Sequence, residues 1–266
     1  KDLKRRKLKA DGRLEKYKMN SSNLKIDNEF LLGLLKKYKS DILMNYANGH
    51  NKKSLQNYDK GSIREIECTT LSSLIRHFKF KNILDIGTGP GRSALAFAQA
   101  LKDENIDGIV DTIDTNQETE ARVLPLLKQF NLQNYVRFHI GNSTIVVTKL
   151  DKKYDFALID GEHSFETTKA DFENIYDKLA IGGICAFHDA YPRPAAAPGV
   201  RNVIEDIVSK KPGQIVFFSE KLFDYFSFQE DIEDAARIAE KWAKYNYSYV
   251  TRDANPKCLM SVYFKE

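Results

Sequence analysis

Apolar residues recur at two different spacings along this chain, and the change of spacing divides it into two parts. Between residues 28 and 78 the spacing is helical, which predicts one helix over residues 28–46 and another over residues 63–78. From residue 82 onward, short apolar runs alternate with amphipathic stretches. The runs predict strands over residues 82–86, 109–114, 136–140, 156–160, 184–187, 215–218 and 259–264.

The amphipathic stretches between these runs predict the connecting helices. They cover residues 93–101, 118–130 (with Pro125 inside), 143–150, 165–179 and 200–209. Strands that alternate with helices form parallel units with right-handed crossovers, so helices cover both faces of one sheet. The pattern therefore predicts an α/β fold: a Rossmann-like, doubly wound, mostly parallel sheet of seven strands. The last two strands are expected to close it as a hairpin-like pair.

The segments outside this alternation predict the domain organisation. Residues 1–60 are interpreted as a basic tail and a helical extension, with a polar loop over residues 47–60. Residues 61–266 are interpreted as the Rossmann-like domain, with a proline-rich loop at residues 191–198 and a helical insertion at about residues 220–257. The N-terminal helices are candidates for a homodimer contact.

Composition and charge narrow the class of protein. Hydrophobic residues make up 42% of the chain and charged residues 29%, and no apolar stretch has the length of a membrane helix. The three cysteines are far apart, which argues against a disulfide framework or a zinc finger and favours a cytoplasmic location. Nine Lys/Arg against three acidic residues in residues 1–18 suggest either a solvated tail or a nucleic-acid contact, and we favour the tail.

A glycine-rich loop, Gly87-Thr88-Gly89-Pro90-Gly91, follows the first predicted strand. Its third glycine comes one residue earlier than in the G-x-G-x-x-G pattern that seats a pyrophosphate. The preceding Asp85 would repel a phosphate but suits a ligand with a cationic end. Asp114, at the end of the second strand, is placed to accept hydrogen bonds from ribose hydroxyls.

Ligands of such sheets bind beyond the carboxyl ends of the strands. We therefore expect the residues at these ends to lie along one edge of the sheet. They are Asp85, Asp114, Gly141, Asp160, His188 and Asp189.

Two segments carry a family resemblance. NILDIGTGPGRSALAFAQAL resembles motif I of class I S-adenosylmethionine-dependent methyltransferases, and IDGEHSFETTKADFENIYDKLAIGGICAFHDA is similar to methyltransferase family 24. The resemblance covers about residues 61–210. It implies a transferase that uses S-adenosylmethionine, a molecule with a sulfonium, an ammonium and no phosphate.

The resemblance also implies roles for individual residues. Asp85 and the glycine loop would hold the methionine end, Asp114 the ribose, and the segment after the third strand the adenine. The expected cofactor-binding residues are Asp85, Gly87, Thr88, Gly89, Gly91, Ser93, Asp114, Asn142, Ser143 and Asp160.

A hydroxyl acceptor must lose a proton, either to a general base or through a metal ion. Asp160, His163 and His188 are the catalytic candidates, although His163 could instead cap the next helix or bond Asp189. Metal-dependent relatives place acids after the fourth and fifth strands, so Asp160, His188 and Asp189 are candidate ligands of Mg²⁺ or Mn²⁺. The histidine departs from the oxygen ligands that magnesium prefers.

Several functions compete at this point. The leading hypothesis is O-methylation of a small hydroxylated metabolite or sugar. The alternatives are an RNA or protein methyltransferase anchored by the basic tail, a non-catalytic cofactor-binding module, and a nicotinamide-dependent dehydrogenase, which the loop spacing disfavours. The fourth strand ends in Asp160-Gly161 and not in an N/D-P-P-Y/F motif, which argues against nucleobase amine methylation.

Overall fold

The computed structural model describes residues 26–49, 63, 65–190, 199–218, 222 and 260–266. The basic tail at residues 1–18, most of the polar loop, the proline-rich loop and nearly all of the insertion at residues 220–257 lie outside the described residues. Among the helices described, none is both long enough and apolar enough to cross a membrane.

One mixed sheet of seven strands forms the centre of the molecule, in the order β3-β2-β1-β4-β5-β7-β6. The first five strands are parallel, and β7 is antiparallel to both of its neighbours. The strands are β1 (Asn82–Ile86), β2 (Ile109–Asp114), β3 (Val136–Ile140), β4 (Tyr154–Ile159), β5 (Leu179–Phe187), β6 (Gly213–Phe217) and β7 (Ser261–Lys265). The prediction of a Rossmann-like, mostly parallel sheet of seven strands with a closing hairpin is confirmed.

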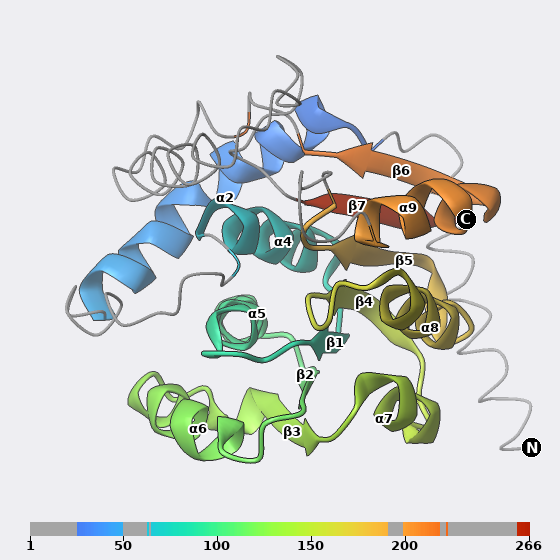
Figure 1. The fold of residues 1–266 in the computed structure, drawn as a ribbon. Coiled ribbons are helices and arrows are strands. Elements are labelled where there is room, and N and C mark those ends of the chain that lie inside the picture. The colour runs from blue at the N-terminus through green and yellow to red at the C-terminus, as the bar shows by residue number, and fades with distance from the viewer. Residues whose placement is uncertain (1–25, 50–62, 64, 191–198, 219–221, 223–259) are drawn as a thin grey trace, which may run out of the picture.

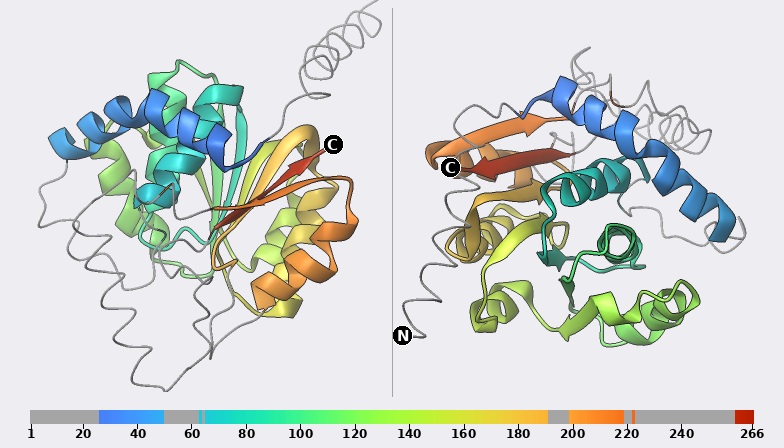
Figure 2. Two further views of the ribbon diagram at one scale, coloured as in Figure 1. Left: turned by 90° about the horizontal axis from the view of Figure 1, so that it is seen from above. Right: turned by 180° about the vertical axis from the view of Figure 1, so that it is seen from behind.

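Helices cover both faces of this sheet (Figure 1). Helices α2 (Asn28–Gly49), α4 (Glu65–Phe78), α5 (Arg92–Asp103) and α6 (Thr119–Gln129) lie on one side. Helices α7 (Ser143–Lys149), α8 (Phe165–Tyr176) and α9 (Gly199–Asp206) lie on the other. Figure 2 shows the twisted sheet between these two layers when the molecule is seen from above. Each layer has its own apolar core against the sheet, because the strands are buried on both faces.

Some predicted boundaries are wrong. Helix α2 continues through residues 47–49, which we had assigned to the loop, since nothing before Gly49 breaks a helix. Strand β5 begins at Leu179 and not at residue 184, and the preceding helix already ends at Tyr176. Gly182 and Gly183 stay within the strand because the β4–β5 pairing shifts register there, and Gly182 has a φ of 79°.

The sheet order reverses between β1 and β4, from which the chain winds outward in both directions. A crevice forms at such a switch point because the connections after the two strands leave in opposite directions. Here the backbone amide of Asp160, just after β4, donates a 2.8 Å hydrogen bond to the carbonyl of Ile86, the last residue of β1. The segments that follow β1 and β4 are therefore in contact.

Candidate functional site

A cavity of about 650 Å³ opens at this switch point, a size typical of small-molecule sites. Its walls come from the loops after β1, β2, β3 and β4 and from the start of α5. The lining includes Gly87, Thr88, Gly89, Arg92, Ser93, Asp114, Asn142, Ser143, Asp160 and His163. The structure thus brings most of the residues predicted for the site to one cavity.

The three glycines of the loop are required for different reasons. A Cβ on Gly87 would lie 2.0 Å from the carbonyl oxygen of Asp160, and a Cβ on Gly91 would lie 2.5 Å from Val123 on α6. A Cβ on Gly89 would meet nothing within 4 Å. Two of the glycines therefore let β4 and α6 approach the loop, while Gly89 alone, with a φ of 49°, leaves open space beside the backbone at the cavity wall.

Asp85 lies one layer behind this wall and is fully buried. Its Oδ2 accepts hydrogen bonds from the hydroxyls of Ser93 (3.0 Å) and Thr112 (2.8 Å). Its Oδ1 has no hydrogen-bond partner among the described residues. Burial raises the pKa of Asp85 to about 7, against the two hydroxyls, which lower it.

Ser93 and Thr88 line the cavity but are already engaged with side chains of the wall. The Ser93 hydroxyl orients Asp85, and the Thr88 hydroxyl lies 2.6 Å from that of Thr112. Any contact of these two residues with a cofactor would therefore be made by groups that the strands have fixed in place.

Asp114 follows β2 and organises the loop in front of it. Its Oδ2 accepts a 2.8 Å hydrogen bond from the backbone amide of Gly89, and its Oδ1 accepts one from the amide of Asn116. A carboxylate has about four acceptor positions, so both oxygens can still accept ribose hydroxyls.

The predicted adenine side carries local contacts of its own. The Asn142 side chain accepts a 2.9 Å hydrogen bond from the backbone amide of Thr144 and so caps α7. The Ser143 hydroxyl donates to Asp171 of α8 over 3.1 Å. Burial raises the pKa of Asp171 to about 6, although the Ser143 hydroxyl lowers it. The cap and this bond hold the segment after β3 at the cavity wall.

Asp160, His163 and His188 lie close together, the first two in the cavity wall and His188 buried behind them. His188 Nδ1 lies 2.8 Å from Asp160 Oδ1, and His163 Nε2 lies 3.5 Å from the same oxygen. One potential ligand atom from each of the three residues lies within 4.8 Å of the others. Both of these imidazole nitrogens are buried and lack an aligned hydrogen-bond partner among the described residues.

Two further carboxylates stand behind the imidazoles. Asp189 Oδ2 lies 3.3 Å from His163 Nδ1, and Glu67 Oε2 of α4 lies 3.3 Å from His188 Nε2. Asp189 has a left-handed backbone (φ 54°), which places its side chain beside the turn after β5. Ser164, and not His163, caps α8, so of the two alternatives for His163 the structure supports the contact with Asp189.

Glu67 was not predicted from the sequence. It is fully buried near the start of α4, four positions after the buried Ile63 and four positions before the buried Leu71. An acidic residue within such an apolar stripe was the signal that could have found it, because a buried carboxylate requires a partner. Arg92 and Thr167 also line the cavity without having been predicted.

Electrostatics favours positive charge between these carboxylates. Burial alone would lower the pKa of His188, but the carboxylates of Asp160 and Glu67 outweigh it and hold that pKa well above its usual value. Burial likewise opposes ionisation of Asp160, but the neighbouring His188 and His163 hold its pKa below its usual value. The cluster is therefore built to keep an ionised carboxylate next to a cation.

The central part of the chain is similar to one family of known proteins. Residues 84–190 match methyltransferase family 24, which is described as a methyltransferase domain. This match covers β1 to the end of β5 and so includes the glycine loop and the residues after β4 and β5. The resemblance to class I methyltransferases inferred from the sequence is confirmed there.

Curated relatives of this chain include caffeoyl-CoA O-methyltransferases and a tricin synthase. Caffeoyl-CoA O-methyltransferase 2 of Petunia hybrida is 30% identical over 126 residues, which cover 44% of this chain and 49% of the relative. Tricin synthase 2 of Oryza sativa subsp. japonica is 26% identical over 162 residues, covering 57% of this chain and 52% of the relative. The chain thus spans about half the length of these relatives.

Solved structures share the fold at low identity. An O-methyltransferase from Bacillus cereus in complex with SAH has a TM-score of 0.54 and 18% identity, covering 67% of this chain and 87% of that one. The O-methyltransferase TomG from Streptomyces achromogenes, in complex with SAM, has a TM-score of 0.52 and 18% identity, covering 72% and 91%. These likenesses establish the Rossmann-like methyltransferase fold.

Proposed function

With a methyltransferase domain at residues 84–190 as the premise, we propose that this chain is an S-adenosylmethionine-dependent O-methyltransferase of a small hydroxylated molecule. The observation that carries the proposal is the cavity at the switch point. The glycine loop, Asp114 and the cluster around Asp160 surround it. The family match and the O-methyltransferase relatives support the reaction type.

The residues present fit this cofactor. Gly89 leaves space for a ligand against the backbone, and the buried Asp85 has an oxygen without a partner among the described residues. A buried carboxylate behind the wall favours the ammonium and sulfonium of S-adenosylmethionine and disfavours a pyrophosphate. Asp114 would bind the ribose hydroxyls, while Asn142 and Ser143 would border the adenine.

Methyl transfer would proceed by in-line displacement. The acceptor oxygen forms a bond to the methyl carbon while the carbon–sulfur bond breaks, and the sulfonium leaves as the thioether of S-adenosylhomocysteine. The acceptor hydroxyl must also lose its proton. Asp160 and His163 line the cavity, so we place this step at their cluster, with either His163 as the base or a cation that lowers the acceptor pKa.

Calorimetry with S-adenosylhomocysteine tests the cofactor assignment. We expect one molecule to bind per chain, and Asp114→Ala to weaken binding about 10- to 100-fold, since charge-assisted hydrogen bonds contribute about 1.5–3 kcal/mol. Asp107→Ala is the matched control, because Asp107 is exposed just before β2, at the other end of the strand from Asp114. This variant should bind S-adenosylhomocysteine with the affinity of the wild type. The absence of binding to the wild type would refute the proposal.

A further inference from the structure

The donor atoms around Asp160 form a pattern different from the one expected from the sequence. Asp160, His188 and Asp189 are the ligands of Mg²⁺ or Mn²⁺ that the sequence predicts. In the structure, the group whose atoms converge is Asp160, His163 and His188. Asp189 is not a member of this group: its Oδ2 lies 3.3 Å from His163 Nδ1, the ring nitrogen that faces away from Asp160, and its Oδ1 lies 3.7 Å from His188 Nδ1.

Each imidazole presents one nitrogen to Asp160 and the other to a carboxylate. His188 directs Nδ1 to Asp160 (2.8 Å) and Nε2 to Glu67 (3.3 Å). His163 directs Nε2 to Asp160 (3.5 Å) and Nδ1 to Asp189 (3.3 Å). A carboxylate that accepts the proton of one ring nitrogen leaves the lone pair of the other free, and this is how histidine ligands of metals are usually oriented.

The two imidazole nitrogens that face Asp160 are also buried. His188 is 2% exposed, and neither its Nδ1 nor the Nε2 of His163 has an aligned hydrogen-bond partner among the described residues. A buried imidazole nitrogen that faces a carboxylate without an aligned hydrogen bond is poorly satisfied, and a cation bound between them would satisfy both groups. Neighbouring ligand atoms of a metal ion lie about 3–3.5 Å apart, given ligand distances of about 2.0–2.2 Å. The two separations from Asp160 Oδ1, 2.8 and 3.5 Å, are close to this range.

We propose that Asp160, His163 and His188 bind a divalent transition-metal ion such as Fe²⁺, Co²⁺, Ni²⁺ or Zn²⁺. Glu67 and Asp189 act as the carboxylates that orient the two imidazoles. Two nitrogen ligands and one oxygen ligand suit these ions, whereas Mg²⁺ prefers oxygen ligands throughout. The ligand set is therefore selective for transition ions over magnesium.

The position of this site deepens the proposed function, on which this step rests. Asp160 and His163 line the cavity, whereas His188 is buried behind them. The ion would therefore be accessible from the cavity, where the hydroxyl of an acceptor can bind it. Coordination lowers the pKa of a hydroxyl and so supplies the proton loss that O-methylation requires. His163 would then act as a ligand and not as the general base.

Metal binding is measured on the full chain without a polyhistidine tag, after chelator treatment and dialysis. We expect calorimetry to give one Co²⁺ per chain, bound at least about 100-fold more tightly than Mg²⁺, and Co²⁺ to produce visible ligand-field absorption. His163→Gln and His188→Gln should each abolish the tight binding. Glu67→Gln should weaken it about 10- to 100-fold while leaving S-adenosylhomocysteine binding intact.

The matched control is His139→Gln. His139 is a histidine of β3 that bonds Asp111 at 2.8 Å and lies outside the cluster, so this variant should bind Co²⁺ like the wild type. Equal or tighter Mg²⁺ binding by the wild type, or undiminished Co²⁺ binding by both His163→Gln and His188→Gln, would overturn the metal proposal. S-adenosylhomocysteine binding by the metal-free chain is scored separately, so failure of the metal site and failure of the cofactor assignment are distinguishable.

Discussion

At the scale of single residues, the site depends on carboxylates that the fold keeps away from water. Asp85 is the clearest case, because its only hydrogen-bond donors among the described residues are two hydroxyls, and both bond the same oxygen. A buried carboxylate destabilises the fold once it is ionised. A cationic ligand in the adjacent cavity would recover part of that cost, and on the proposed function Asp85 would therefore link stability, pH and cofactor binding.

Cofactor binding should strengthen as Asp85 loses its proton. With a pKa of about 7, Asp85 is mostly neutral at pH 6 and mostly ionised at pH 8, and only the ionised form attracts the ammonium. We expect S-adenosylhomocysteine to bind up to about tenfold more tightly at pH 8 than at pH 6 by calorimetry. Asp85→Asn should bind with little dependence on pH in this range.

The control for this experiment is Asp171→Asn, because Asp171 also titrates below neutrality, with a pKa of about 6. This variant should keep the rise in affinity, and a flat profile there would assign the effect to Asp171 instead.

The stability of the fold should fall, and not rise, as the pH increases and Asp85 loses its proton. Since the folded pKa of Asp85 is raised from 3.8, its favourable contribution is full below about pH 4 and is lost by about pH 7. Asp85→Asn should therefore melt at a higher temperature than the wild type at pH 8.

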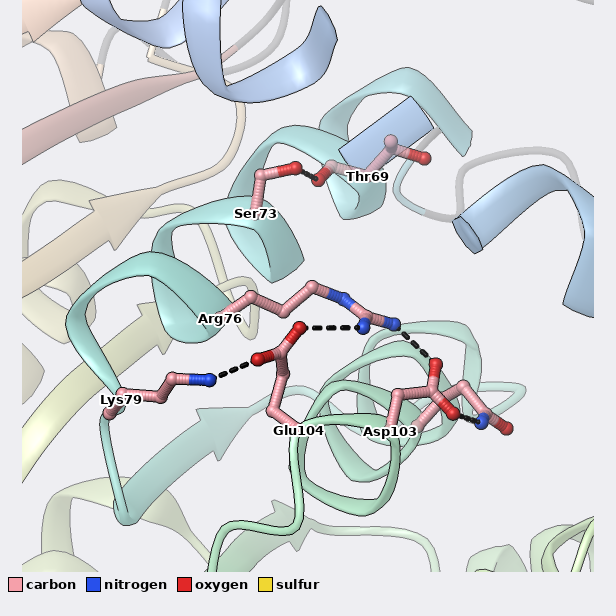
Figure 3. Close-up of polar contacts among 7 residues, drawn as sticks. Thr69, Ser73, Arg76, Lys79, Asp103 and Glu104 are labelled. Atoms are coloured by element: carbon pink, nitrogen blue, oxygen red, sulfur yellow. Dashed lines mark hydrogen bonds and ion pairs between the residues drawn. The ribbon is translucent and has the colours of Figure 1, made fainter. Parts of the chain in front are cut away.

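At the scale of elements, helix α4 connects the site to the layer of helices on its side of the sheet. Its Glu67 contacts His188 near the helix start, and its Arg76 contacts the end of α5 in the last turn. Between them, the Ser73 hydroxyl donates to the Thr69 carbonyl one turn earlier, as Figure 3 shows. A helix with this many buried polar groups is held in one register by their partners and not by apolar packing alone.

Arg76 forms ion pairs between α4 and the end of α5. Its guanidinium donates to Asp103 at 2.6 Å and lies 3.5 Å from Glu104, while its side chain is 2% exposed (Figure 3). We expect Arg76→Met to lower the free energy of unfolding by about 2–3 kcal/mol in urea titrations. This is less than for a fully buried pair, because the two acids retain some contact with water.

Lys79 provides the comparison, since it pairs with the same Glu104 but is 54% exposed. Exposed ion pairs contribute about 0–1 kcal/mol, so Lys79→Met should change stability by no more than that. If the two substitutions cost the same, Arg76 has no special role in fixing α4 on α5.

At the scale of the whole molecule, the last strand is an interior strand of the sheet and not an edge strand. Strand β7 lies between β5 and β6 and pairs antiparallel with both. Its Val262, Tyr263 and Phe264 are buried and contribute to the cores on both faces. Strand β7 therefore joins the five parallel strands to β6.

Deletion of residues 260–266 should abolish cooperative folding. It would remove the partner of two strands and expose apolar surface on both faces of the sheet. Thermal unfolding followed by circular dichroism should show no sharp transition, and the chain should aggregate. Tyr263→Phe keeps the strand and removes only the 2.6 Å hydrogen bond to Pro212, at a cost of about 1 kcal/mol, so it should fold normally. A truncated chain that melts cooperatively would contradict this account.

The sequence by itself determined the order and type of the elements and the part of the site that is formed by the glycine loop, Asp85 and Asp114. Alternating short strands and amphipathic helices fit one class of sheet, because the period of a strand and the period of a helix are different. The spacing of the glycine loop with Asp85 and Asp114 indicated a cationic, phosphate-free cofactor. Each of these features is read within one strand and the loop that follows it, and the structure brings these segments to one cavity.

Only the tertiary structure decided how side chains from distant segments meet. Glu67 and His188 are 121 positions apart, and no spacing within either segment indicates that they face each other. His163, and not the predicted Asp189, joins Asp160 and His188. This depends on the left-handed turn after β5 and on the start of α8, which the local sequence pattern does not determine. The strand order, with β7 inside the sheet, likewise results from packing between elements. Periodicity is a property of neighbours along the chain, whereas a three-residue cluster is a property of neighbours in space.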